Sequence, residues 1–160
     1  MLANHAEVEV GEPSTPRERL MADHQHLERL LRTLLIRARS GDAPDVVEPW
    51  RAFEEGLRAH LLAEEEELFP AYKLEAPEEV CALRREHAEI RALLDSAGFG
   101  VELHTARLLM LEDLAERIRD HAKREDHGLY EFADRAPSGL WEHLRARLGD
   151  AMHRTASIVV

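Results

Sequence analysis

Four long stretches of the chain repeat apolar residues at three- and four-residue steps, the period of an α-helix with one buried face. The first stretch follows Thr15, Pro16 and Glu18, which supply a helix N-cap, a proline suited to the first helical turn and a capping-box glutamate. We expect this helix to end near Ser40-Gly41. Its apolar row contains a histidine, because the row reads Leu20, His24, Leu27, Leu31 and Leu34.

The other three stretches are separated by prolines and glycines. The second helix is expected to begin between Pro44 and Pro49, and the third to begin at Pro77 and to end at Gly98-Phe99-Gly100. The fourth is expected to begin a few residues later and to run to Pro137. Each row again contains a histidine: the rows read Trp50, Phe53, Leu57, His60, Glu64 and Leu68; Val80, Leu83, His87, Ile90 and Leu94; and Arg107, Met110, Leu114, Ile118, His121 and Glu125.

Four amphipathic helices joined by short links predict an all-α protein, an up-down-up-down four-helix bundle. We expect a loose N-terminal arm at 1–14 and the bundle at 15–136. Residues 137–160 are expected to form a short extra C-terminal helix, with Trp141, Leu144 and Leu148 on its apolar face, and a tail.

Composition narrows the classes of partner and location. The 160 residues have a formal net charge of −11, which disfavours a nucleic-acid phosphate surface as a partner. No apolar run is as long as a membrane span, and the N-terminal residues lack the apolar core of a signal peptide. The single cysteine, Cys81, excludes an internal disulfide. These features favour a cytoplasmic location, and we expect no membrane and no nucleic acid among the partners.

The chain consists of two related halves. Each half contains a lone histidine after an acidic residue, then a His-x3-Glu pair, then a Leu-aromatic step. In the first half these are Asp23-His24, His60-x3-Glu64 and Leu68-Phe69, and in the second they are Glu86-His87, His121-x3-Glu125 and Leu129-Tyr130. The lone histidines are 63 residues apart, and the His-x3-Glu pairs are 61 residues apart.

The repeated residues predict a dinuclear metal site. Residues four apart share a helix face, so both members of a His-x3-Glu pair can reach one point in the core. Two glutamates in an apolar core are costly unless cations compensate their charge. Imidazole and carboxylate together suit iron and, to a lesser extent, manganese or zinc. The candidate metal ligands are His24, His60, Glu64, His87, His121 and Glu125.

Other polar residues near these positions are interpreted as surface residues. Asp126 is an alternative to Glu125, because it makes His-x4-Asp with His121. Glu65, Glu66 and Glu67 are expected to form a mostly solvated charge run. The histidines outside the apolar rows are expected on the surface, namely His5, His26, His104, His127, His143 and His153.

From about Leu20 to about Phe132, these motifs resemble the hemerythrin-like (HHE cation-binding) domain family. The resemblance rests on Asp23-His24, His60-x3-Glu64-Glu65 with Leu68-Phe69-Pro70, Glu86-His87, and His121-x3-Glu125-Asp126. It implies two non-haem iron ions in a four-helix bundle. It further implies that the four histidines are terminal ligands and that Glu64 and Glu125 bridge the ions.

The chain departs from the oxygen-carrying members of that family at two places. Those proteins have a further histidine four residues after the ligand in the third helix, where this chain has Arg91. They use His-x4-Asp in the last helix, where this chain has His-x3-Glu ending at Glu125. We therefore expect an open position on the ion served by His87 and His121. Arg91 should extend to solvent or pair with a nearby carboxylate.

The expected function is the binding of dioxygen or a related small oxidant, nitric oxide or peroxide, in sensing or stress response. An alternative is a di-iron enzyme that reduces peroxide or nitric oxide, or that oxidises iron. A protein that stores or donates iron is the other alternative. A ferritin-like bundle is disfavoured, because ferritin-like sites use Glu-x-x-His rather than His-x3-Glu.

Overall fold

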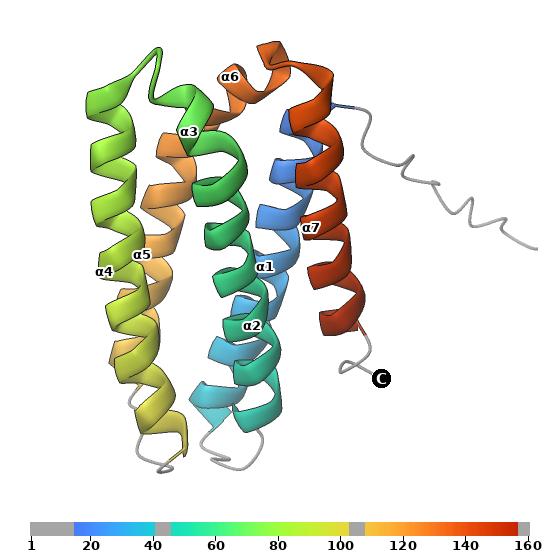
Figure 1. The fold of residues 1–160 in the computed structure, drawn as a ribbon. Coiled ribbons are helices and arrows are strands. Elements are labelled where there is room, and N and C mark those ends of the chain that lie inside the picture. The colour runs from blue at the N-terminus through green and yellow to red at the C-terminus, as the bar shows by residue number, and fades with distance from the viewer. Residues whose placement is uncertain (1–14, 41–45, 103–107, 157–160) are drawn as a thin grey trace, which may run out of the picture.

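The computed structural model describes residues 15–40, 46–102 and 108–156, and every regular element in these ranges is helical (Figure 1). The all-α prediction is therefore confirmed. A π-helical turn and a short helix continue α2, and another short helix follows α5. The elements are α1 (Pro16–Ser40), α2 (Val47–Ala63), η2 (Glu64–Leu68), α3 (Phe69–Tyr72), α4 (Pro77–Glu102), α5 (Leu108–Asp126), α6 (Leu129–Arg135) and α7 (Ser138–Ala156). The arm expected at 1–14 lies outside the described residues.

The long helices pack side by side (Figure 1). α1 and α4 each contact both α2 and α5, and α7 lies against α1 and α2. None of the described helices combines the length and the hydropathy that a membrane span requires.

The start of α1 follows the predicted capping box. The backbone N–H of Glu18 donates to Thr15 Oγ1 at 3.2 Å, and the backbone N–H of Thr15 donates to Glu18 Oε2 at 3.2 Å. Two otherwise unpaired N–H groups of the first turn are thereby satisfied. The helix ends at Ser40, as the glycine at position 41 predicts.

The predicted break at Gly98-Phe99-Gly100 is wrong, because α4 continues to Glu102. Gly98 lies against the indole of Trp50 in α2, and a Cβ atom at this position would meet that ring at 3.3 Å. The glycine therefore lets two helices approach closely. In this case its packing role, rather than its tendency to end helices, explains its presence.

The fourth helix is shorter than predicted, and the helix after it is longer. α5 ends at Asp126, and Pro137 follows the separate helix α6. A Cβ atom on Gly128, in the turn between them, would meet the Tyr72 hydroxyl at 3.0 Å. α7 has 19 residues rather than a few turns, and Leu144 and Leu148 on it are fully buried.

Two apolar clusters fill the core, and a polar layer separates them. One cluster contains Leu27 to Leu35 of α1 and the facing parts of α2, α4 and α5. The other contains Leu20 and residues of α3, α6 and α7. Between them along the helices lie six buried polar or charged residues: Asp23, His60, Glu64, His87, His121 and Glu125. Such groups are tolerated in a core only when partners satisfy them.

Candidate metal centre

The six predicted ligands meet at the polar layer, which contains five of them, and His24 lies at its edge. Their donor atoms form two groups, each within 4.8 Å, that share both glutamates. His24 and His60 complete one group, which we call the first site, and His87 and His121 complete the other, the second site. The His24 side chain is 16% exposed, whereas those of the other five residues are at most 4% exposed.

Each glutamate presents one oxygen to each site. In the first site, His60 Nε2 lies 3.1 Å from Glu64 Oε1, and His24 Nε2 lies 3.4 Å from Glu125 Oε2. In the second, His87 Nε2 lies 3.5 Å from Glu64 Oε2, and His121 Nε2 lies 3.0 Å from Glu125 Oε1. A carboxylate must lie in this way if it is to bridge two cations.

The acidic residue before each lone histidine orients the histidine of the His-x3-Glu pair. His60 Nδ1 lies 2.6 Å from Asp23 Oδ2, and His121 Nδ1 lies 2.7 Å from Glu86 Oε2. When Nδ1 donates to these carboxylates, the lone pair of Nε2 faces the centre, which is the tautomer that a metal ligand needs.

The residue after each glutamate faces a lone histidine. His87 Nδ1 lies 2.9 Å from Glu65 Oε1, which also accepts from the Arg91 guanidinium at 2.7 Å. Against the cost of burial, hydrogen bonds from His87 and Arg91 lower the pKa of Glu65 to about 2. The expectation that Glu65 is merely solvated is thus wrong. Arg91 pairs with a carboxylate, which is one of the two arrangements expected for its side chain.

Asp126 does not replace Glu125 in the cluster. Its Oδ1 lies 3.8 Å from His24 Nδ1, on the outer side of that ring, and Asp126 belongs to neither site. Glu66 and Glu67, which were expected to be solvated, both pair with Arg147 of α7. His127 and His143 are exposed, as expected, and His26 is partly buried. The side chains of His5, His104 and His153 lie outside the described part of the chain.

The carboxylates keep protons on the imidazoles. Burial favours neutral rings, but the charge of Glu64 and the hydrogen bond of Asp23 raise the pKa of His60 well above its ordinary value. The charge of Glu125 likewise outweighs burial and raises the pKa of His121 to about 9. Burial alone would raise the pKa of Glu125, but His121 holds it well below its usual range. Cations that bind here must therefore displace protons.

Two buried polar atoms support the fit of a cation. Within the part of the chain that the structure describes, Glu64 Oε2 and His121 Nε2 have no hydrogen-bond partner. His121 Nε2 is 3.0 Å from Glu125 Oε1 but outside hydrogen-bond geometry. An unsatisfied buried polar atom costs about 1–3 kcal/mol. Both atoms face the second site, where a cation would satisfy them with the imidazole and carboxylate donors that iron accepts.

Sequence reasoning missed Tyr130, whose fully buried side chain reaches the first site. Its hydroxyl donates to Glu64 Oε1 at 2.7 Å and lies 2.7 Å from His24 Nε2. Burial and the charges of Glu64 and Glu125 raise the pKa of this phenol well above its ordinary value. The Leu-aromatic step of the repeat could have pointed to Tyr130. It indicated only that Tyr130 is the counterpart of Phe69 and not that its hydroxyl reaches the site.

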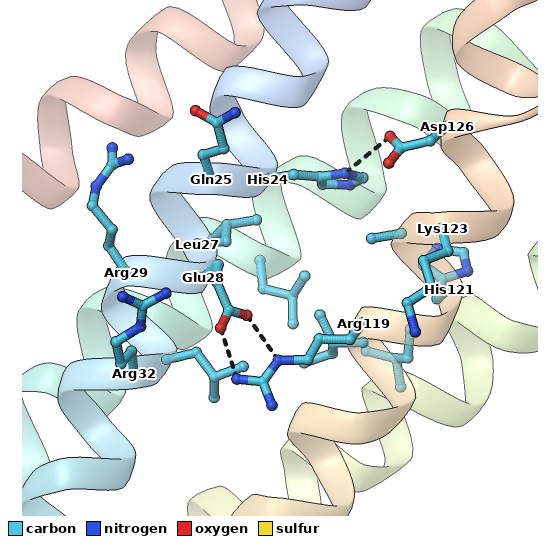
Figure 2. Close-up of a pocket in the computed structure, with 15 residues that line it drawn as sticks. His24, Gln25, Leu27, Glu28, Arg29, Arg32, Arg119, His121, Lys123 and Asp126 are labelled. Carbon is cyan, nitrogen blue, oxygen red and sulfur yellow. Dashed lines mark hydrogen bonds and ion pairs between the residues drawn. The ribbon is translucent and has the colours of Figure 1, made fainter.

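A pocket of about 490 Å³ between α1 and α5 opens beside both sites (Figure 2). His24 lines it from α1 and His121 from α5, one histidine from each site. An ion pair between Glu28 and Arg119 joins the two helices across it, with contacts of 2.7 and 3.1 Å. The apolar residues that line it are Leu27, Leu31, Leu57, Ile90, Ile118 and Ala122, and the other polar ones are Gln25, Arg29, Arg32, Lys123 and Asp126.

The family model of the hemerythrin HHE cation-binding domain matches residues 15–133. The chain therefore belongs to the hemerythrin HHE cation-binding domain family. The match covers α1 to α5, most of α6, and every residue of both sites. No curated protein and no solved structure gives a significant match.

Proposed function

We propose that the protein holds two non-haem iron ions and binds dioxygen or a related small oxidant, such as nitric oxide or peroxide, in sensing or stress response. His24, His60, His87 and His121 would be terminal ligands, and Glu64 and Glu125 would bridge the ions. The observation that supports this most strongly is that each glutamate faces His60 or His24 with one oxygen and the second site with the other.

The proposal includes an up-down-up-down bundle of α1, α2, α4 and α5. The contacts of α1 and α4 with both α2 and α5 support this arrangement, because they place each helix between two neighbours. A cytoplasmic location and the absence of nucleic-acid and membrane partners stay predictions from the sequence.

Ferrous iron would supply the electrons that a small oxidant accepts. The protein side chains set the conditions for this. Asp23 and Glu86 hold two imidazoles in the binding tautomer. Glu65, fixed by Arg91, holds a third imidazole. Tyr130 places its hydroxyl oxygen at the first site, 2.7 Å from both Glu64 Oε1 and His24 Nε2.

The pocket between α1 and α5 offers a route for a small ligand. It reaches both sites through His24 and His121, and its six apolar lining residues offer contacts that suit a small uncharged molecule. Arg91 stands where the oxygen carriers have a further histidine, and its guanidinium pairs with Glu65 at 2.7 Å, so we expect the ligand to bind at the second site.

The test begins with protein reconstituted anaerobically with ferrous iron. We expect close to two iron ions per chain and a rapid visible absorbance change on stopped-flow mixing with dioxygen or nitric oxide. Iron content near zero would contradict the metal assignment. A full iron load whose spectrum responds to dioxygen, nitric oxide and peroxide no faster than solvent-exposed iron would contradict the ligand-binding function.

A variant pair can test the route. Ala122→Phe places a large side chain in the pocket and should slow the absorbance change while iron content stays the same. Ala92→Phe, at an exposed position of α4, is the matched control and should leave the rate unchanged. Equal rates in wild type and Ala122→Phe would show that small ligands enter elsewhere.

A further inference from the structure

The hydroxyl of Tyr130 lies among all four donor atoms of the first site. It is 2.7 Å from both His24 Nε2 and Glu64 Oε1. It is 3.2 Å from His60 Nε2 and 3.4 Å from Glu125 Oε2. The side chain is fully buried, so water does not compete for this position.

These distances match those between neighbouring ligands of one metal ion. Metal–ligand bonds of about 2.1 Å, typical of divalent ions with nitrogen and oxygen ligands, place adjacent ligand atoms about 3 Å apart in an octahedron. The spacings of His60 from Glu64, 3.1 Å, and of His24 from Glu125, 3.4 Å, lie in the same range. The phenol oxygen thus completes a set of five protein donors around one point.

The internal repeat gives the second site no such donor. Phe69 stands 61 residues before Tyr130, as His60 stands before His121. Each aromatic ring lies against the lone histidine of one site, Phe69 against His87 and Tyr130 against His24, and both centroid distances are 5.1 Å. The two rings occupy equivalent places, and only one has a hydroxyl.

The turn at Gly128 makes this contact possible. In an uninterrupted helix, residue 130 would point about 140° away from Glu125, since five residues turn the chain by that angle beyond a full circle. α5 ends at Asp126 instead, and α6 begins at Leu129. This change in the direction of the chain places the Tyr130 hydroxyl beside Glu64 and Glu125.

We propose that Tyr130 is a fifth protein ligand of the ion in the first site and binds through its phenol oxygen. On binding, the O–H bond breaks, the oxygen bonds to the cation, and the proton is released to solvent without electron transfer. The inference rests on the proposed di-iron function. It makes the two ions unequal, with the second site keeping the position at which a small ligand binds.

The test uses full-length protein loaded with iron and oxidised in air, with iron measured in the same samples. A ferric ion bound by a phenolate gives a charge-transfer band in the visible range, and Raman excitation within it enhances tyrosine ring vibrations. We expect both signals in wild type. Tyr130→Phe should lose nearly all of the signal per bound iron while circular dichroism shows the same helix content.

The chain offers matched controls on both sides. Tyr72 is the only other tyrosine, so Tyr72→Phe should keep the full band. Phe69→Tyr supplies the missing hydroxyl to the second site and should increase the band, up to about twofold. Iron-loaded wild type without tyrosine vibrations, or an unchanged band in Tyr130→Phe, would overturn Tyr130 as a ligand and leave the di-iron function standing. Wild type that binds no iron would overturn both.

Discussion

The two sites are built from the same parts, and their differences show what the repeat does and does not determine. In each site a His-x3-Glu histidine is oriented by the acidic residue before a lone histidine. Asp23 and Glu86 do this at 2.6 and 2.7 Å. The sites then diverge, because Asp23 is buried while the Glu86 side chain is 21% exposed. The residues that the two halves share thus supply the candidate donor atoms, and the residues that differ between the halves would set how each ion behaves.

The helices are interrupted at equivalent places by different means. At Glu64, α2 passes into a π-helical turn, a feature that often occurs at functional sites. After Glu125, α5 ends and a turn at Gly128 leads to α6. Each interruption brings an aromatic ring against a lone histidine, Phe69 in one half and Tyr130 in the other.

The largest expected effect comes from the residues that the two sites share. Glu64→Gln and Glu125→Gln each remove a charge that faces both ions, so each should reduce iron content from about two per chain to near zero. His24→Ala should leave one ion. Asp120→Asn, at an exposed position of α5 outside both sites, is the control for elemental analysis and should keep both. If Glu125→Gln keeps its iron and Asp126→Asn loses it, then Asp126 rather than Glu125 is the ligand.

The next effect is on the stability of the metal-free protein. The pKa of His121 is about 9 in the folded protein, against 6.5 in the unfolded chain. The stabilisation that results is fully present below pH 6.5 and is lost as the pH rises to about 9. For this group the loss is about 3 kcal/mol as an upper bound. Urea unfolding at pH 6 and pH 9 should show the decline, and His121→Gln should reduce it. The exposed His127→Gln should not.

Metal affinity should respond to pH in the opposite direction. The imidazoles must lose protons before they bind cations, so affinity should rise across the same interval. Titration with ferrous iron at pH 6.5 and pH 8 tests this. Equal affinities at both values would contradict protonated imidazoles in the metal-free centre.

The difference in burial between Asp23 and Glu86 should appear as a difference in affinity. Removing the carboxylate that orients a metal-binding histidine typically costs 10–100-fold in affinity. Asp23→Asn should lose affinity near the upper end of this range, since water cannot replace the hydrogen bond of a buried group. Glu86→Gln should lose affinity near the lower end. Chelator competition measures both. A larger loss in Glu86→Gln would show that exposure does not control these contacts.

The sequence predicted which polar side chains meet in the core better than it predicted the course of the surrounding chain. His24, His60 and the other four candidates could be found because helical periodicity and the repeat place them on one face. The continuation of α4 through Gly98 could not, since it depends on the close approach of Trp50 from another helix. Tyr130 was missed because periodicity places it away from Glu125 unless the helix ends between them, and that ending depends on the Gly128 turn.

The smallest effect is expected at Arg91, which acts on the second site only through Glu65. Arg91→Met should lower the affinity of the second site for its ion by a few-fold, because an ion pair with a 30% exposed side chain contributes about 1 kcal/mol or less. Arg117→Met removes a comparable surface pair with Glu89 and is the control. A loss of both ions in Arg91→Met would mean that Arg91 supports the whole centre.

Mössbauer spectroscopy of the iron-loaded, oxidised protein tests the central claim most directly, since it reports the number and the environments of the iron ions. The two sites share two glutamates but differ at Tyr130 and Phe69, so we expect two quadrupole doublets of equal area from a magnetically coupled pair. In Tyr130→Phe the doublets should become more alike. A single uncoupled ferric ion, or iron in one environment only, would contradict a dinuclear centre with unequal sites.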